Sequence, residues 1–218
     1  MSTMLFAVAD GVGGYEGGKD ASELAIAALR NKALEIQNEF SVRSVLEDIH
    51  EQLLHTAKAR NYRNMGTTIA LAKIFPNLQT GRGGKILSAN VGDSPVLLFR
   101  SSSSNFEVGS EYESVYTDDS FRNKMPGSMW AVVQYLGVES KEIDVHAKTF
   151  EYQADDIVLI CSDGISDNLL SENTYSRGRG SANIEELVRK TGSARRIVEE
   201  ALRAGVKADD MTAVLVFL

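Results

Sequence analysis

Aspartates placed directly beside short apolar segments are the feature that most limits how this chain can fold. Asp10, for example, follows the apolar run 6–9, and Asp163 follows the apolar run 157–161 after one serine. Runs of this length and composition are typical of buried strands. A side chain just beyond a buried strand is held rigidly and still reaches solvent, so we expect these carboxylates to gather at strand ends. The aspartates of this kind are Asp10, Asp93, Asp163, Asp167 and Asp209.

An oxygen-ligand metal site is one interpretation of this pattern. Carboxylates that converge without cationic partners repel one another, and the repulsion raises the pKa of each group. Mg²⁺ and Mn²⁺ prefer oxygen ligands and would remove that conflict. The chain has one cysteine and three histidines, and they lack the clustering that a zinc site needs. The alternative is a turn role for each aspartate, because Asp-Gly and Gly-Asp are ordinary turn dipeptides.

The spacing of apolar residues predicts an α+β fold in a single domain that spans residues 1–218. A first helix is expected from Asp20, which begins a variant of the capping-box pattern, to about Gln37. Further helices are expected from Ser41, with a clear amphipathic stripe, and from Ser193. Strands are expected at 5–9, 67–75, 85–91, 96–100, 145–152, 157–161 and 211–218. This order favours antiparallel sheets at the centre, with amphipathic helices covering them.

Residues 101–134 form the least regular part of the sequence. They combine a run of serines, mixed charges and a Pro-Gly pair. We expect an irregular surface excursion here, because long loops of this kind often carry function. A flap that recognises the substrate is one interpretation of it.

Charge and hydropathy exclude several classes of protein. The net charge of −7 argues against binding to nucleic acid or to an anionic membrane surface. No apolar run approaches the ~20 residues of a membrane-spanning helix, and the first residues lack the pattern of a signal peptide. We therefore expect a cytoplasmic protein, with an organelle left open. The sequence leaves the oligomeric state undetermined.

Several short motifs follow one another along the chain. They are FAVADGVGG at 6–14, GTT at 66–68, ANVGDS at 89–94, YLG at 135–137, DIVLICSDGISD at 156–167 and ADDMT at 208–212. In this order they resemble the signature segments of the protein phosphatase 2C family, the metal-dependent Ser/Thr phosphatases. The form without a histidine in the first motif is closer to the bacterial-type members and to the branch that resembles mitochondrial phosphatases.

The resemblance implies a central β-sandwich flanked by helix pairs, with two Mg²⁺ or Mn²⁺ ions and a weaker third site at one end. It implies that Asp10 bridges the two metals and that the carbonyl of Gly11 ligates one of them. Asp163 and Asp209 would hold the other metal and, with Asp10, carry the catalysis. The residues that match the family's metal positions are Asp10, Gly11, Asp93, Asp163, Asp167 and Asp209. The implied reaction is hydrolysis of phosphoserine and phosphothreonine in a phosphorylated protein by a metal-activated water.

Two departures from the family pattern give the alternative function. Val12 stands where many members have a histidine, and a valine transfers no proton. The family usually has an earlier strand with an acidic metal ligand, whereas residues 1–9 contain no Asp, Glu, Arg or Lys. We expect a domain shortened at its N-terminus, with an open sheet edge. The alternative is therefore a pseudophosphatase, or a module that binds phosphoproteins with little or no activity.

Overall fold

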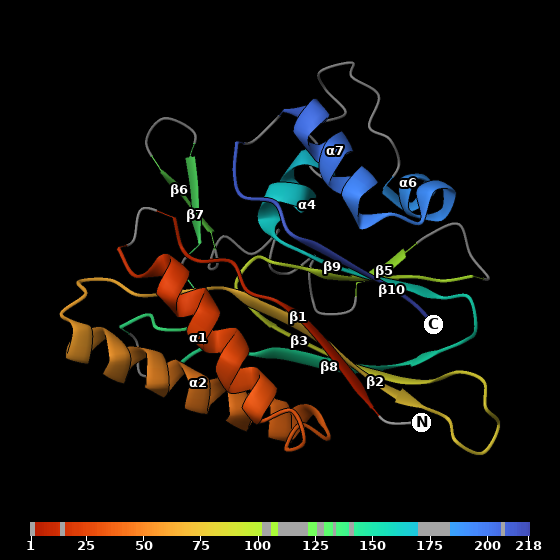
Figure 1. Ribbon diagram of the computed structural model, residues 1–218, viewed down its shortest axis with the longest axis horizontal. Helices are drawn as coiled ribbons and strands as arrows, with labels where there is room; N and C mark the ends of the chain where they lie inside the picture. Colours follow the sequence, from red (N-terminus) through yellow and green to blue (C-terminus); the bar gives the residue numbers. More distant parts are fainter. Residues whose placement is uncertain are drawn as a thin grey trace.

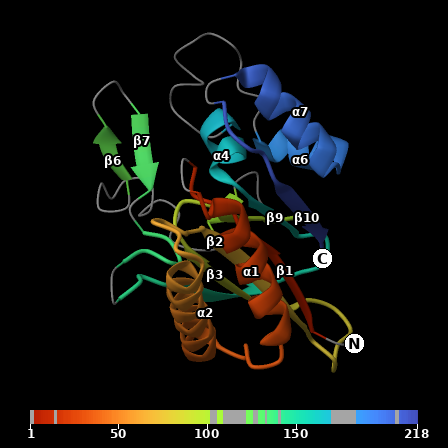
Figure 2. The ribbon, with the colours of Figure 1, turned by 60° about the vertical axis from the view of Figure 1, so that its left-hand side comes forward.

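Two antiparallel sheets packed face to face form the middle of the molecule, and helices cover both outer faces (Figures 1 and 2). The computed structural model describes residues 3–13, 16–101, 106–108, 122–125, 129–132, 134–139, 142–169, 184–205 and 208–218. The first sheet has the strand order β1-β2-β3-β8 and the second has the order β10-β9-β4-β5. This architecture confirms the predicted α+β sandwich.

The bounds of the strands follow the apolar runs of the sequence closely. The first sheet consists of β1 (Met4–Val8), β2 (Ile69–Pro76), β3 (Gly84–Val91) and β8 (His146–Tyr152). The second sheet consists of β10 (Ala213–Phe217), β9 (Ile157–Cys161), β4 (Val96–Phe99) and β5 (Phe106–Val108). In the described part of the chain, β1 pairs with β2 alone and β10 pairs with β9 alone, so each ends its sheet.

Alternate residues of the central strands face two different hydrophobic cores. On β2, Ala70, Ala72 and Ile74 point into the space between the sheets, where they meet Val158 and Ile160 of β9. The intervening residues of both strands point outward into the helical layers. Successive side chains of a strand lie on opposite faces, and both faces are covered here. The central strands are therefore mostly apolar on both faces instead of alternating regularly with polar residues.

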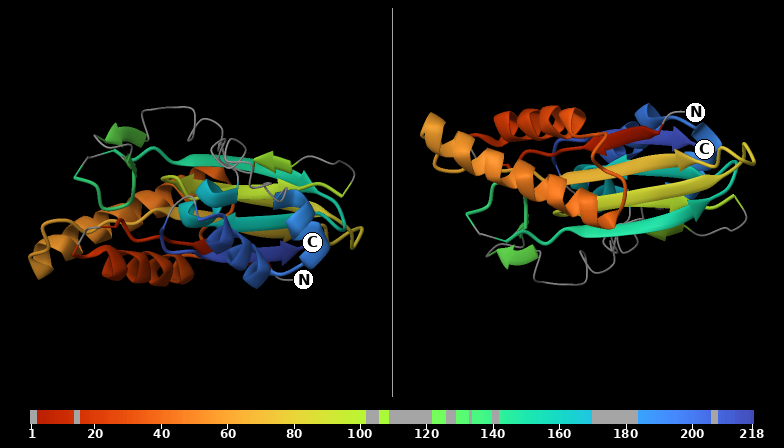
Figure 3. Two further views of the ribbon diagram at one scale, coloured as in Figure 1. Left: turned by 90° about the horizontal axis from the view of Figure 1, so that it is seen from above. Right: turned by 90° about the horizontal axis from the view of Figure 1, so that it is seen from below.

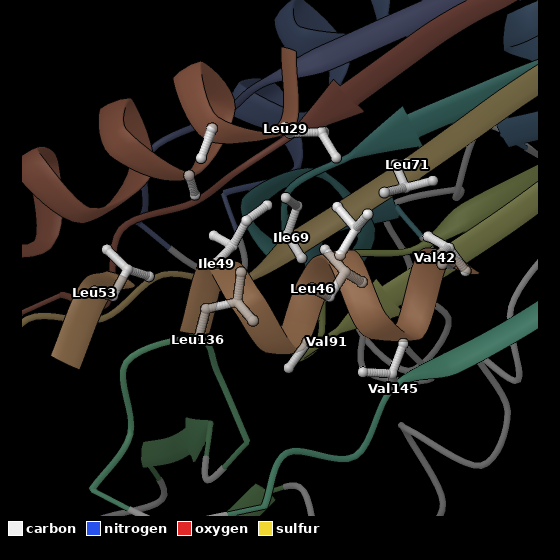
Figure 4. Close-up of a cluster of buried hydrophobic side chains, with 14 of the residues drawn as sticks. Leu29, Val42, Leu46, Ile49, Leu53, Ile69, Leu71, Val91, Leu136 and Val145 are labelled. Atoms are coloured by element: carbon white, nitrogen blue, oxygen red, sulfur yellow. The ribbon is translucent and has the colours of Figure 1, made fainter. Parts of the chain in front are cut away.

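Helices α1 (Gly18–Asn31) and α2 (Glu39–Arg60) cover the first sheet, as seen from below in Figure 3. The amphipathic stripe predicted for the second helix is confirmed, because it packs against the sheet and is 0–3% exposed. Figure 4 shows this packing against Ile69, Leu71 and Val91. The stripe consists of Val42, Val45, Leu46, Ile49 and Leu53.

The predicted starts of these two helices are wrong by a few residues. α1 begins at Gly18 behind Gly17, which provides no side-chain cap, and it ends at Asn31 instead of near Gln37. The side chain of Asp20 instead pairs with Arg60 and accepts a hydrogen bond from the Tyr62 hydroxyl at 3.0 Å. α2 begins after Asn38, whose side chain accepts from the backbone N–H of Ser41 at 2.9 Å. Ser41 is the return partner of that capping box.

Helices α4 (Asp163–Leu169), α6 (Ile184–Thr191) and α7 (Ala194–Ala204) cover the second sheet, as seen from above in Figure 3. Ser193 caps α7 as predicted, because its hydroxyl accepts from the N–H of Arg196. Leu202 of the same helix is 61% exposed. The described helices include none that is long and apolar enough to cross a membrane.

The segment 101–134 contains strands that the sequence did not predict. β5 pairs with β4, while β6 (Arg122–Met125) and β7 (Met129–Val132) form a separate hairpin beside the sandwich (Figure 2). The rest of the expected excursion lies outside the described residues. The substrate flap remains a prediction.

A buried lysine holds the turn that follows α1 against the first sheet. Lys73 of β2 is 1% exposed, and its ammonium group donates to the carbonyls of Ala33 at 2.7 Å and Ile36 at 2.5 Å. The ammonium group also lies 5.3 Å from the centre of the Phe75 ring. Burial lowers the pKa of Lys73 below its ordinary value. The two carbonyl bonds therefore position the connection between α1 and α2.

Replacing this lysine tests its role in the fold. Lys73→Met keeps most of the volume but leaves two buried carbonyls without their donor, so we expect the free energy of unfolding to fall by about 1–3 kcal/mol at neutral pH. The measurement is urea denaturation followed by circular dichroism. An unchanged unfolding midpoint would contradict this account of the turn.

The pH dependence of the same pair of proteins gives a second readout. Between the lowered pKa and the ordinary value of 10.5, the unfolded chain holds a proton that the folded chain has released. The free energy of unfolding of the wild type should therefore rise with pH across this window, relative to Lys73→Met. Parallel curves for the two proteins would show that the pKa of Lys73 is not lowered by folding.

Candidate metal centre

The strand ends that carry the predicted aspartates meet at one end of the sandwich. In the first sheet, the last residue of β1 pairs with Ala70, and the last residue of β3 pairs with Ile69. In the second sheet, the last residue of β9 pairs with the first residue of β10. The turn 92–95 joins the end of β3 to the start of β4, so it brings these two sets of strand ends together. Asp10, Asp93, Asp163 and Asp209 all follow or precede strands at this end.

Asp10 is fixed through its backbone by two threonines at the start of β2. Its carbonyl accepts from the N–H of Thr68 at 2.8 Å and from the hydroxyl of Thr67 at 2.9 Å. Its N–H donates to the hydroxyl of Thr68 at 3.3 Å. The next residue, Gly11, forms an isolated β-bridge with Thr67. A Cβ atom on Gly11 would lie 2.5 Å from the carbonyl oxygen of Gly18, so the loop closes tightly on itself.

Asp93 lies in the turn between β3 and β4 and is held against the same threonine. It is only 4% exposed. The hydroxyl of the following residue, Ser94, shares a hydrogen bond of 2.8 Å with the hydroxyl of Thr68. The preceding residue, Gly92, has a φ of +100° and lies so close to Thr68 that a Cβ atom would be 2.8 Å from its methyl carbon. The loops of Asp10 and Asp93 therefore meet at Thr68.

Asp163 and Asp209 are brought together on the second sheet. Asp163 begins α4 directly after β9, and Asp167 lies one turn further along that helix; both are 9% exposed. The hydroxyl of Ser162 donates to the carbonyl of Asp210 at 3.2 Å and accepts from the N–H of Thr212 at 3.0 Å. The segment that carries Asp209 therefore lies beside the start of α4, with the side chain of Asp209 exposed.

A backbone bond connects the two groups of loops. The N–H of Cys161, at the end of β9, donates to the carbonyl of Pro95 at 3.2 Å. The thiol of Cys161 is fully buried. Burial raises the pKa of this thiol, and the charges of Asp163 and Asp167 raise it further. These two carboxylates are thus near enough to Cys161 to act on it electrostatically.

The predicted ligands at this end match a hard dication in donor type. Every predicted ligand offers oxygen, which Mg²⁺ and Mn²⁺ prefer. Within the described ranges, however, no three His, Cys, Asp or Glu side chains lie close enough together to hold a metal ion. The structure therefore collects the loops of Asp10, Asp93, Asp163, Asp167 and Asp209 without closing their side chains into one ligand set.

The hydroxyl groups that join these loops are the site residues that sequence reasoning missed. Thr68, Ser94 and Ser162 are each no more than 4% exposed, and each bonds a segment far away in the sequence. Each stands within two residues of a predicted ligand or inside a motif. Small hydroxyl residues next to apolar strands were the available signal, but their partners are fixed only by the fold.

Comparisons with known proteins identify the family. A family model described as protein phosphatase 2C matches residues 2–204. The chain therefore belongs to the protein phosphatase 2C family, a family of protein serine/threonine phosphatases, as its motifs predicted.

Individual relatives are similar over most of the chain. The chain is 29% identical to the protein phosphatase PhpP of Streptococcus pneumoniae in an alignment of length 189 that covers 78% of this chain and 69% of PhpP. It is 25% identical to the serine/threonine phosphatase stp of Listeria welshimeri in an alignment of length 182 that covers 76% of this chain and 67% of that protein.

Solved structures share the fold. The serine/threonine phosphatase Stp1 of Staphylococcus aureus has a TM-score of 0.70 and 24% identity, covering 100% of this chain and 84% of Stp1. The catalytic domain of the phosphatase PstP, in complex with two manganese ions, has a TM-score of 0.62 and 22% identity. That match covers 98% of this chain and 88% of the PstP chain.

A pair of glycine substitutions tests how tightly the segments of the centre pack. A Cβ atom on Gly164 would lie 2.3 Å from the carbonyl oxygen of Asp210, whereas a Cβ atom on Gly13 would meet nothing within 4 Å. Gly164→Ala must push α4 away from the segment of Asp209, so we expect the free energy of unfolding to fall by about 1–3 kcal/mol. Gly13→Ala should change it by no more than about 0.5 kcal/mol. Equal effects in urea denaturation would refute the close packing.

Proposed function

We propose that this protein hydrolyses phosphoserine and phosphothreonine in phosphorylated proteins, with Mg²⁺ or Mn²⁺ bound at the end of the sandwich. The observation that carries the proposal is the meeting of separate acidic loops at that end, each fixed by buried hydrogen bonds to its neighbours. Membership of the protein phosphatase 2C family supports the reaction. The manganese ions in the PstP structure support the metal.

The residues that would hold the metals are those that match the metal positions of the family. Asp10 and the carbonyl of Gly11 would bind metal on the side of the first sheet. Asp163 and Asp209 would bind metal on the side of the second sheet. Asp93 and Asp167 would complete a third, weaker position with Asp163. When bound, paired dications neutralise charge on a phosphoryl group and make a water molecule more acidic.

The chain's own residues contribute rigidity and exclude a covalent route through sulfur. The backbone bonds of Asp10 hold the loop that carries its carboxylate in place. The thiol of Cys161, the sole cysteine, is buried and kept protonated by its raised pKa, so it cannot attack phosphorus. Val12 supplies no proton to the leaving group. Direct attack by water is the route that these residues permit.

One observation favours the alternative of a pseudophosphatase. The described carboxylates do not close into a set of three ligands. A protein that binds a phosphoprotein without hydrolysing it would need less of the metal centre than an enzyme does. The two functions are separated by measuring turnover and metal binding independently.

Isosteric replacements of the central carboxylates test the proposed function. Asp10→Asn and Asp163→Asn each remove one negative ligand without changing volume. We expect Mn²⁺-dependent phosphate release from p-nitrophenyl phosphate and from a phosphothreonine peptide to fall by roughly 10²-fold or more. The matched control is Asp155→Asn, an exposed turn residue with a φ of 69°, which asparagine tolerates.

Thermal unfolding supplies the readout that does not depend on turnover. A ligand that binds only the folded state raises the melting temperature, so Mn²⁺ should raise it in the wild type and in Asp155→Asn but less in the two site variants. Metal stabilisation without turnover in the wild type would identify the pseudophosphatase. If millimolar Mn²⁺ caused no stabilisation and supported no turnover, that result would overturn the metal centre itself.

A further inference from the structure

A cavity of about 580 Å³ lies between the C-terminal end of α2 and the segment 134–139, which follows the β6–β7 hairpin. Its lining is mixed: apolar and aromatic surface comes from residues such as Leu54, Tyr62, Met65 and Tyr135, and polar surface comes from Asn64 and from charged residues at the rim. Figure 4 shows the same segment reaching α2 at Leu136. We call this cavity the Tyr62–Tyr135 pocket.

The inner wall of the pocket is also the back of the glycine loop at the candidate metal centre. A Cβ atom on Gly17 would lie 2.9 Å from Met65 and 3.0 Å from the Tyr62 ring. A Cβ atom on Gly66 would lie 2.5 Å from the Tyr135 ring, so this ring rests directly on the Gly66 backbone. The carbonyl of Gly66 accepts from the N–H of Val12 at 2.9 Å. The pocket and the loop of Asp10 and Gly11 therefore share one wall.

Hydrogen bonds hold this wall in place. Thr67 and Leu136 exchange two backbone bonds of 3.0 and 2.9 Å, and Thr67 also bridges Gly11. The N–H of Gly137 donates to Nδ1 of His50, a residue of α2 that is 3% exposed, at 3.1 Å. The pocket is thus anchored to α2 on one side and to the glycine loop on the other.

The rim of the pocket carries two cations on the side of α2. Lys58 and Arg63 are exposed, and within the part of the chain that the structure describes neither forms an ion pair. Arg60, the basic residue between them in the chain, differs in this respect because it is paired with Asp20. Glu139 lies on the rim formed by the segment 134–139. An acidic group entering the pocket would accordingly be drawn to the α2 side.

We propose that the Tyr62–Tyr135 pocket binds the substrate protein beside its phosphorylated residue. It would take an apolar or aromatic side chain between the two tyrosines and an adjacent acidic side chain at Lys58 and Arg63. The inference rests on the proposed phosphatase function, since it places the phosphorylated residue at the end of the sandwich. It adds a preference in the substrate sequence that the metal centre by itself would not impose.

The reach of an extended peptide decides which substrate position enters. Met65 and Arg63, which both line the pocket, are two and four residues from Thr67, and Thr67 pairs with Gly11. At roughly 3.3 Å per extended residue, the pocket begins roughly 7–13 Å from the loop of Asp10. A substrate segment spans this distance with two to four residues. The preferred side chains should therefore lie about three residues from the phosphorylated one.

Labelled phosphothreonine peptides test the proposal. One peptide carries Leu-Glu pairs three residues from the phosphothreonine on both sides, and a second carries Ala-Gln at the same positions. We expect wild type to favour the first peptide about tenfold in kcat/KM and in affinity measured by fluorescence anisotropy, because both an apolar contact and a charge contact are lost in the second. Equal values for the two peptides would overturn the proposal.

Two variants locate the preference in the pocket. Arg63→Glu reverses one rim charge, and Ala57→Leu fills the cavity from α2 with a residue that favours a helix. Each should lower the ratio of kcat/KM for the Leu-Glu peptide to that for p-nitrophenyl phosphate by about tenfold. The matched control is Arg82→Glu, which lies beside a different cavity lined by Phe75 and Tyr152 and should leave this ratio unchanged. If neither pocket variant changed this ratio, the pocket would be excluded as the source of the substrate preference.

The two readouts separate the failure of this inference from failure of the proposed function. Anisotropy that favours the Leu-Glu peptide, and loses that preference in Arg63→Glu, would support the pocket even without turnover. Turnover of both peptides without preference would leave the phosphatase function standing and overturn the pocket.

Discussion

The hydroxyl of Thr68 is the contact on which the arrangement of the candidate centre depends. It accepts from the backbone of Asp10 and shares a short hydrogen bond with Ser94. These three residues come from the end of β1, the start of β2 and the turn into β4, which crosses between the sheets. Because Thr68 is 4% exposed, loss of its hydroxyl would leave buried polar groups without partners. Buried hydrogen bonds in the core therefore help to fix the position of the acidic loops.

Much of the fold could be predicted from local patterns. The stripe of α2, the cap at Ser193 and the apolar runs of β3 and β9 each depend on residues close together in sequence. The placement of aspartates at strand ends followed from the same runs. α4 was not predicted because all seven of its residues are buried, which removes the amphipathic period that reveals a helix. The start of α1 was misplaced because Gly17 packs against Tyr62 and Met65, a contact that no local pattern indicates.

The candidate site was predicted less completely, and the reason is physical. The apolar runs indicate that Asp10, Asp93 and Asp163 lie at the ends of strands. Only the pairing of the strands shows that these strand ends lie at the same end of the sandwich. The bonds that join the loops connect residues far apart in the chain, such as Asp10 with Thr68 and Ser162 with Asp210. The wall shared by the glycine loop and the Tyr62–Tyr135 pocket is likewise formed by residues from distant parts of the chain. It depends on glycines whose neighbours are distant in sequence.

The burial of Cys161 has a consequence for how this molecule responds to chemical stress. Enzymes that use a thiolate nucleophile are silenced when oxidants convert that thiolate to a sulfenic acid. Here the sole sulfhydryl lies under the helices of the second sheet and stays protonated, so peroxide finds no reactive thiolate in the native state. Alkylation of this group would proceed only when the helical layer lifts from β9. The rate of alkylation of Cys161 therefore measures how often that half of the sandwich opens.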